Sequence, residues 1–278
     1  MSAAQRNYEI VNSIAENPIK LLHISDLHFG PPYVPEVGEA ALRMASKLKS
    51  DAVIISGDLT QRATREQFVS AKQFLDRLPG APQLVIPGNH DVPLYRIWER
   101  MFRPHALYQE IITAELNPVL KIRGAVIAGL DSTAPRSAIS NGRIFKRQLD
   151  ACEQVFRDVP SDYARIVVAH HHFAPAPDHL HDSNMPKAKR AIERFADWKV
   201  DMILGGHLHR AYIGNSLDFY PGSHRDKGSS SRNAVQPPRD VDAAANGKRI
   251  HSIKLKLGPT RSRLRTMSTS MKAGILNR

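Results

Sequence analysis

Five short polar motifs, each directly after an apolar run of strand length, constrain this chain more than any other feature. The runs before them read as β-strands because they are short, apolar and followed by polar or glycine-containing segments. We therefore expect five strand ends that carry potential metal-ligating side chains. The motifs are Asp26-Leu27-His28, Gly57-Asp58, Gly88-Asn89-His90-Asp91, His170-His171-His172 and Gly206-His207-Leu208-His209.

Amphipathic stretches of helical length separate the strand-like runs, and this alternation predicts a layered α/β fold. Because ligand sites in α/β sheets form just beyond the carboxyl ends of strands, the five motifs are expected to converge on one point. The segment 93–117 is expected to hold one or two helices. The expected strands are 19–24, 52–55, 83–86, 125–130, 164–169 and 202–204, and the expected helices are 36–49, 65–78, 146–156 and 187–198.

The composition is that of a chain able to bury a substantial core, with 42% hydrophobic residues among 278. The chain contains no run of eighteen or more apolar residues, so no membrane span is predicted. The start of the chain lacks the layout of a secretory signal. The single cysteine, Cys152, excludes an internal disulfide. These features predict a cytoplasmic protein with no membrane partner.

The formal net charge of +12 invites a nucleic-acid partner, but the distribution of the charge argues against one. Residues 223–278 contain 13 Lys and Arg against 3 Asp and Glu, which leaves a net charge of only +2 for residues 1–222. The positive charge therefore belongs to the end of the chain, and a nucleic-acid partner is not expected. The oligomeric state is left open.

The motif residues are donors suited to divalent metal ions. Asp26 and His28 are two positions apart on an extended segment, so both side chains point to the same side and can bind one ion. Asp58 adds a carboxylate that can bridge two ions. Mixed oxygen and nitrogen donors without thiolate favour Mn, Fe, Zn or Co over Ca or Mg. Two such ions about 3.5–4 Å apart are typical of phosphate-ester hydrolases.

The order and placement of the motifs resemble the calcineurin-like metallophosphoesterase superfamily and look most like its class III cyclic-nucleotide phosphodiesterase branch. The likeness spans roughly residues 20–220. It implies a four-layer α/β/β/α sandwich of two mixed sheets flanked by helices. It also implies a hydrolase for a small phosphodiester, such as a cyclic nucleotide, by in-line attack of a metal-bridging hydroxide.

The resemblance also implies two ligand sets that share Asp58. The first metal ion would be held by Asp26, His28, Asp58 and His209, and the second by Asp58, Asn89, His170 and His207. His90 would be the catalytic residue that stabilises the transition state or protonates the leaving oxygen. Two roles stay open for Asp91, which either orients His90 or is solvated in its loop. His171 is expected to support a ligand or face the substrate, and His172 to be structural.

The likeness ends after residue 222, so we divide the chain into an N-terminal extension, 1–18, a metallophosphoesterase domain, 19–222, and a basic tail, 223–278. The tail reads as disordered because it is polar and basic. A shifted reading frame is a sharper hypothesis. Shifted by one base with permitted synonymous codons, residues 227–258 encode TATSRR and NSFN, which resemble the closing segment of the family. In that case the closing strands are absent and a sheet edge is exposed.

Two other functions remain as alternatives. A DNA or RNA nuclease of the same superfamily would need a basic face on the folded body, and the net charge of +2 over residues 1–222 argues against it. A non-catalytic scaffold on the same fold is the other alternative, and the intact ligand set with His90 argues against that.

Overall fold

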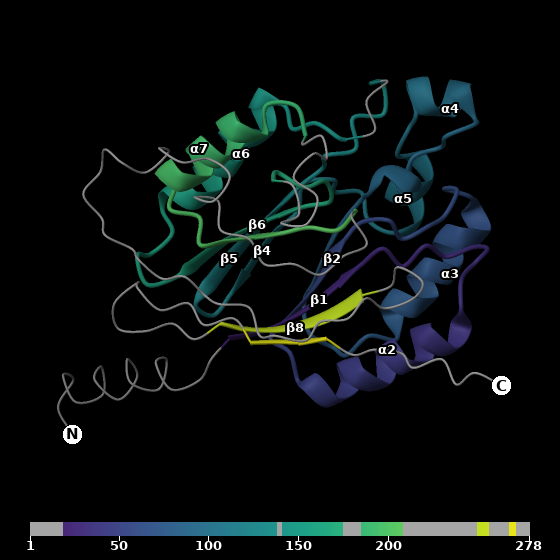
Figure 1. Cartoon of the computed structure of the whole chain (residues 1–278), viewed down its shortest axis with the longest axis horizontal. Helices are drawn as coiled ribbons and strands as arrows, with labels where there is room; N and C mark the ends of the chain where they lie inside the picture. The colour runs from purple at the N-terminus through teal and green to yellow at the C-terminus, as the bar shows by residue number, and fades with distance from the viewer. Residues whose placement is uncertain (1–18, 138–140, 175–184, 208–248, 256–266, 271–278) are drawn as a thin grey trace.

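Two β-sheets pack face to face, and helices cover the outer face of each sheet (Figure 1). This is a computed structural model of the chain, and it describes residues 19–137, 141–174, 185–207, 249–255 and 267–270. The four layers confirm the predicted α/β/β/α sandwich, and the expected strands and helices within residues 19–204 all form.

The first sheet has the strand order β3-β2-β1-β8-β9. Its parallel part consists of β1 (Ile19–Ser25), β2 (Ala52–Ser56) and β3 (Gln83–Ile86). β8 (Arg249–Leu255) pairs antiparallel with β1, and β9 (Met267–Ser270) pairs antiparallel with β8. The carboxyl ends of the three parallel strands therefore lie at one edge, where the first three motifs begin.

The second sheet has the strand order β4-β5-β6-β7. β5 (Ala125–Leu130), β6 (Ala164–Ala169) and β7 (Met202–Leu204) are parallel, and β4 (Val119–Ile122) pairs antiparallel with β5. The two histidine motifs follow β6 and β7. β4 was not expected, because its exposed and half-buried residues alternate over only four positions.

The strands are apolar on both faces because each sheet is covered twice. Along β2, Ala52 and Ile54 point into the core between the two sheets. Val53 and Ile55 point the other way, into the core beneath the helices of the first sheet. A continuous run of buried residues is the expected signature of such a strand, and the short apolar runs in the sequence reflect it.

Each sheet is covered on its outer face by two helices. α2 (Pro35–Leu48) and α3 (Arg65–Asp76) cover the first sheet, and α6 (Lys146–Arg157) and α7 (Ala188–Asp197) cover the second (Figure 1). α3 begins after Thr64, whose hydroxyl accepts a hydrogen bond from a backbone amide of the first turn, as an N-cap does.

The segment 93–117 forms two short helices, α4 (Ile97–Phe102) and α5 (Ala106–Ile111), as predicted. A single 3-10 turn, η1 (Asn89–Asp91), precedes them and contains most of the third motif. α5 packs on α3 through the buried ring of Tyr108, which lies edge-on to Phe68 with ring centroids 6.2 Å apart. α4 has no buried residue.

The end of the chain differs from the sequence-based expectation in one respect. A tail without closing strands leaves the β1 edge exposed, whereas β8 pairs with β1 along its whole length, from Ile19 opposite Leu255 to Ser25 opposite Arg249. Ile253 and Leu255 alternate with polar residues, which is the strand pattern that the basic composition obscured. The boundaries at residues 18 and 222 and the shifted reading frame stay predictions.

Among the residues that the structure describes, no helix combines the length and the apolar character that a bilayer crossing requires.

Candidate metal centre

Four of the predicted ligand residues have a left-handed backbone conformation, so Asp26 and His28 do not lie on the extended segment that the sequence predicted. φ is 56° at Asp26, 47° at His28, 52° at Asp58 and 72° at His207. Side chains with a Cβ rarely adopt positive φ, and each instance costs about 1–3 kcal/mol. Nine non-glycine residues in the described ranges do so. Because four of the nine are predicted ligands, the strain is concentrated at the strand ends and indicates loops shaped for binding.

The loops after β1, β2 and β3 approach each other closely. The backbone amide of His28 donates to the carbonyl oxygen of Asp58, over 2.9 Å. A Cβ at Gly57, where φ is 89°, would lie 2.8 Å from Nδ1 of His170, and a Cβ at Gly88 would lie 2.2 Å from Oδ1 of Asp58. The two glycines are therefore required for the side chains to meet.

Asp58 lies at the centre of the site and is 1% exposed. Its Oδ2 is 3.3 Å from Nε2 of His170 and 3.7 Å from Nε2 of His28. It belongs to two groups whose ligand atoms all lie within 4.8 Å of one another, one with His28 and His90 and the other with Asp26 and His170. These groups differ from the predicted ligand sets, because Asp26 lies with His170 and because His90, which is not a predicted ligand, lies with His28. Asp58 is the residue that both groups share.

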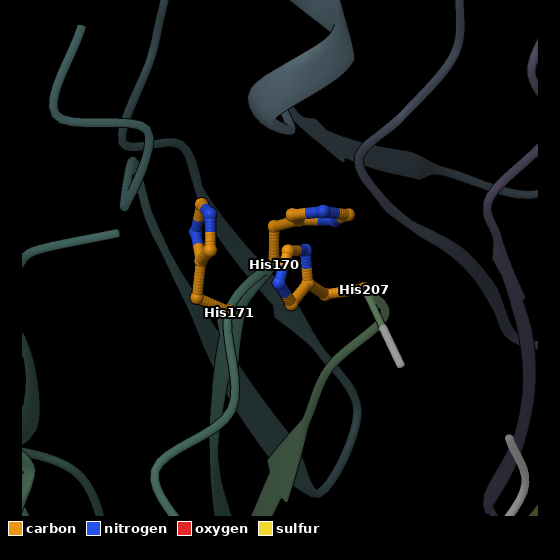
Figure 2. Close-up of side chains that lie close together, drawn as sticks. All are labelled: His170, His171 and His207. Carbon is orange, nitrogen blue, oxygen red and sulfur yellow. The ribbon is translucent and has the colours of Figure 1, made fainter. Parts of the chain in front are cut away.

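The second sheet contributes histidines to the same place. Oδ1 of Asn89 lies 3.0 Å from Nε2 of His170 and 2.9 Å from Nδ1 of His207. The backbone amide of His207 donates to Oδ1 of Asp26 over 3.0 Å, which joins the loop after β7 to the loop after β1. Figure 2 shows the imidazoles of His170, His171 and His207 close together at the ends of β6 and β7. Residues from both sheets thus meet at one site.

His170 is oriented as a metal ligand would be. Its Nδ1 donates to the backbone carbonyl of Ser56 over 2.8 Å, so its Nε2 faces Asp58 and Asn89. A hydrogen bond from one ring nitrogen to a carbonyl, with the other nitrogen free to coordinate, is the usual arrangement of a ligating histidine.

Burial and ionic pairing oppose each other at this site. Burial disfavours the charged form of both partners, yet the attraction between Asp58 and His170 is stronger. The pKa of His170 is raised to about 9, and the pKa of Asp58 is held well below its usual range. A proton on His170 thus compensates the Asp58 carboxylate, and a bound cation would take the place of that proton.

His171 occupies a different setting from its neighbour. Its Nδ1 lies 2.8 Å from the hydroxyl of Ser132, and burial together with the nearby His170 lowers its pKa well below the usual range. Its ring is 4.7 Å from that of His207. His171 is therefore neutral, buried and in contact with a predicted ligand. His172 stacks on His207 with ring centroids 5.8 Å apart.

His90 lies at the edge of the cluster. Its Nδ1 donates to the backbone carbonyl of Gln61 over 3.0 Å, and its ring packs edge-on against His28 with centroids 4.7 Å apart. Its backbone amide donates to Oδ1 of Asp58 over 2.8 Å. With Nδ1 engaged, Nε2 is the remaining ring nitrogen of His90.

Asp91 joins two loops through its buried carboxylate. It is buried, and its carboxylate accepts hydrogen bonds from the backbone amides of Leu59, Thr60 and Gly88 at 2.9–3.1 Å. Burial and the nearby Asp58 charge raise its pKa to about 6, although the amide bonds favour its charged form. Asp91 thus holds the loop after β2 against the loop after β3.

Sequence reasoning did not find the groups that orient the histidines. The carbonyl oxygens of Ser56 and Gln61 have no side-chain signature, so no pattern reveals them. Ser132 did have a signal, because Asp131-Ser132-Thr133 follows the strand 125–130 as the five motifs follow theirs. His209, the predicted seventh ligand, lies outside the described residues.

The residues present fit a pair of divalent cations. Six of the seven predicted ligands come together, and they present carboxylate, amide and imidazole donors. Glycines replace side chains where the donors need room, at Gly57, Gly88 and Gly206, where a Cβ would lie 3.0 Å from Oδ2 of Asp26. A four-layer α/β/β/α sandwich with such a cluster at its strand ends defines the metallophosphoesterase class.

Comparison with known proteins gives the family. The chain belongs to the calcineurin-like phosphoesterase family, which matches residues 19–211. It is 28% identical over 169 residues to a probable glycerophosphodiester phosphodiesterase, GpdQ, of Arcobacter nitrofigilis, covering 59% of this chain and 58% of that protein. It is also 28% identical over 205 residues to a probable cyclic nucleotide phosphodiesterase of Rhodococcus erythropolis, covering 68% of this chain and 64% of that protein. The predicted family is confirmed.

Solved structures agree on the fold. A purple acid phosphatase, PPD1, from yellow lupin (Lupinus luteus) seeds superposes with a TM-score of 0.53 at 14% identity, over 69% of this chain and 38% of that one. GAP50 of Plasmodium, described as the anchor in the inner membrane complex, has a TM-score of 0.54 at 11% identity, over 92% and 90% of the two chains. At these identities the likeness concerns the fold alone.

Proposed function

We propose that the protein is a dimetal-dependent phosphodiesterase that hydrolyses a small phosphodiester, with a cyclic nucleotide as one candidate. The observation that carries the proposal is the position of Asp58 between two groups of donor atoms. Both relatives with curated names are called probable phosphodiesterases, and each match covers under two thirds of the relative's length.

In this proposal Asp26, His28, Asp58 and His209 hold one cation, and Asp58, Asn89, His170 and His207 hold the other. The donor set suits Mn, Fe, Zn or Co. When bound, a pair of cations supplies a nucleophile from water at neutral pH and offsets the charge on the phosphate. Asp91 keeps the two loops in register, and His171 supports the ring of His207 from the side.

His90 has the role of general acid. Its Nδ1–H bond to Gln61 fixes the ring, so that Nε2 is presented beside His28 and Asp58. From there Nε2 gives a proton to the leaving oxygen as the phosphorus–oxygen bond breaks. General acids of this kind contribute about 10²–10⁴-fold to the rate.

The test of the function is a substrate panel with defined metal content. The purified protein is stripped with a chelator, reloaded with Mn²⁺, Zn²⁺, Fe²⁺ or Co²⁺, and assayed on bis-p-nitrophenyl phosphate, p-nitrophenyl phosphate and a cyclic nucleotide. We expect metal-dependent cleavage with preference for diesters. A loaded protein that binds two ions and cleaves none of these esters would favour the scaffold instead.

The general acid is tested by His90→Gln with two leaving groups. A p-nitrophenolate leaves without help, whereas an alkoxide needs a proton. We therefore expect a loss of about 10²–10⁴-fold on an alkyl diester and a much smaller loss on bis-p-nitrophenyl phosphate. Equal losses on both substrates, with the metal content unchanged, would contradict the proton-donor role.

The cytoplasmic location stays a prediction, as do the domain boundaries at residues 18 and 222.

A further inference from the structure

The segment after the Gly88–Asp91 motif exposes a group of large apolar side chains. Six of the nine exposed large apolar residues in the described ranges lie within nine consecutive positions. The side chains of Trp98, Tyr95 and Phe102 are 79%, 74% and 68% exposed. Contiguous apolar surface of this kind marks an interaction site. We call this group the α4 patch, and it consists of Leu94, Tyr95, Ile97, Trp98, Met101 and Phe102.

The α4 patch has the geometry of one continuous surface. Ile97 and Met101, and likewise Trp98 and Phe102, are four positions apart on α4, so each pair lies on the same side of the helix. The rings of Trp98 and Phe102 stack with centroids 5.6 Å apart and an interplanar angle of 13°. Figure 1 shows α4 at the periphery of the molecule, beyond α5 and away from both sheets. The patch therefore projects outward.

Arginines surround the α4 patch. The guanidinium of Arg62 lies 5.4 Å from the centroid of the Tyr95 ring. Nε of Arg136 donates to the carbonyl oxygen of Met101 over 2.8 Å, and Arg103 follows α4 directly. These contacts place positive charge beside the apolar side chains from three different parts of the chain.

Two more arginines lie within the segment itself. Nη2 of Arg96 donates to the carbonyl oxygen of Ala63 over 2.7 Å, and Arg100 caps the carbonyl oxygen of Pro93. The single acidic residue, Glu99, pairs with Arg96 at 2.9 Å. The rim of the patch thus has five arginines, and the nearby acidic residues are Glu99, Glu66 beside Arg96 and Glu110 beside Arg103. Arginines outnumber carboxylates there, although residues 1–222 as a whole are nearly neutral.

We propose that the α4 patch docks this protein on the surface of a bilayer that contains anionic phospholipids. Exposed Trp and Phe side chains with aliphatic neighbours partition into the boundary between headgroups and acyl chains. Arginines beside them are attracted to the negative lipid headgroups. A projecting element with both features matches the chemistry of such a surface on the apolar and on the charged side.

The charge of the rim disfavours the other occupants. In a symmetric pair of copies each patch would face its own mate, which brings the arginine rims of both copies together. A nucleic acid could pair its phosphates with the arginines and stack its bases on the aromatic rings. It would gain no comparable contact from the aliphatic side chains of Leu94, Ile97 and Met101. An anionic bilayer can take up the apolar side chains and also attract the positive charge around them.

Docking of this kind places the candidate metal centre beside the lipid surface. Arg62 and Ala63, which contact Tyr95 and Arg96, directly follow Gln61, whose carbonyl accepts from His90. The proposal departs from the sequence-based expectation of no membrane partner, which considered only spanning segments. It holds whether or not the protein is a phosphodiesterase, because the patch contains no predicted metal ligand.

The test measures binding to vesicles in the absence of substrate, with both metal-free and metal-loaded protein. Vesicles of phosphatidylcholine alone are compared with vesicles of phosphatidylcholine and phosphatidylglycerol by flotation. We expect binding to the anionic vesicles that weakens as salt is added. The double variant Trp98→Glu/Phe102→Glu should lower the partition coefficient by more than about tenfold.

A matched control uses another exposed aromatic residue of the described ranges that has arginines nearby. Phe145 is exposed, and the guanidinium groups of Arg143 and Arg147 lie 5.2 and 5.6 Å from its ring centroid. Phe145→Glu should bind vesicles as the wild type does. Arg103→Gln should weaken binding by about fivefold, the effect of one surface arginine. If Phe145→Glu reduces binding as much as Trp98→Glu/Phe102→Glu, the α4 patch is not the docking surface.

Fluorescence distinguishes the remaining outcomes. The chain has two tryptophans, so Trp198→Phe leaves Trp98 as the only one. We expect Trp98 to be quenched by iodide in buffer and to become protected and blue-shifted with anionic vesicles. Protection before vesicles are added would mean that another segment of the chain covers the patch. Self-association lost in Trp98→Glu/Phe102→Glu, or binding to single-stranded DNA in place of vesicles, would likewise overturn the proposal.

Discussion

Two consecutive segments of this chain depart from the usual rule that polar side chains are exposed and apolar side chains are buried. In the Gly88–Asp91 segment Asp91 is a buried carboxylate, whereas the Leu94–Phe102 segment exposes six large apolar side chains. Buried polar groups need partners, and exposed apolar groups gain from being covered. Asp91 finds its partners within the chain, in the backbone amides of Leu59, Thr60 and Gly88, whereas the six apolar side chains stay exposed among the described residues. The comparison teaches that the first segment is organised around the candidate metal centre and that the second is shaped for a surface outside the protein.

Asp58→Asn is expected to have the largest effect on the candidate metal centre, because it removes the charge that two groups of donors share. Loss of residues that merely support a ligand reduces affinity or activity by about 10–100-fold, so we expect a loss of more than about 100-fold in phosphodiesterase activity and fewer than two metal ions per chain. Asp76→Asn, on the exposed face of α3, serves as the control. Unchanged metal content in Asp58→Asn would contradict the bridging position.

A pair of glycine substitutions tests how tightly the polar loops pack. A Cβ at Gly88 would lie 2.2 Å from Oδ1 of Asp58 and 2.4 Å from its backbone nitrogen, whereas a Cβ at Gly80 meets nothing within 4 Å. We expect Gly88→Ala to destabilise the protein by about 1–3 kcal/mol, as overpacking does, and to lower metal affinity. Gly80→Ala should leave both unchanged. Thermal unfolding and metal titration give the two readouts, and equal behaviour of the two variants would refute the close approach.

Asp91→Asn addresses the buried carboxylate that joins the two loops. An amide keeps only one oxygen acceptor, so at least one of the backbone amides of Leu59, Thr60 and Gly88 loses its partner. An unsatisfied buried amide costs about 1–3 kcal/mol. We expect the lower end of that range, because removal of the Asp91 charge also relieves its repulsion with Asp58. Chemical denaturation measures the effect, and a more stable variant would show that repulsion dominates.

Trp98→Ala gives the smallest expected effect and sharpens the contrast with Asp91→Asn. A side chain that is 79% exposed has little to lose on truncation in the isolated protein. The free energy of unfolding should change by less than about 0.5 kcal/mol. A loss of several kcal/mol would mean that Trp98 packs against the rest of the chain, and the segment would then not depart from the usual rule.

Much of the fold was predictable, because its strands are short apolar runs with helices between them. β2, for example, was expected over 52–55 and extends over Ala52–Ser56. β4 was not predicted, since four residues that alternate between exposed and half-buried carry too weak a signal. β8 was not predicted either, because its pairing with β1 depends on an edge some 230 positions earlier in the chain.

At the candidate site, the sequence predicted which side chains would lie at the strand ends, but it did not predict which backbone groups would orient them. Asp58 and His170 stand out in the sequence, and the structure brings them within 3.3 Å. The carbonyl oxygens that orient His170 and His90 belong to Ser56 and Gln61. Any residue has such an oxygen, so only the path of the chain reveals which one is used. The exposure of Trp98 was equally hidden, because apolar residues at helical spacing usually face a core.

Anomalous diffraction from crystals of the Mn²⁺-loaded protein tests the central claim most directly. The account predicts two peaks about 3.5–4 Å apart, one on each side of the Asp58 carboxylate, with His170 and His207 at one of them. A single peak, or peaks remote from Asp58, would contradict it.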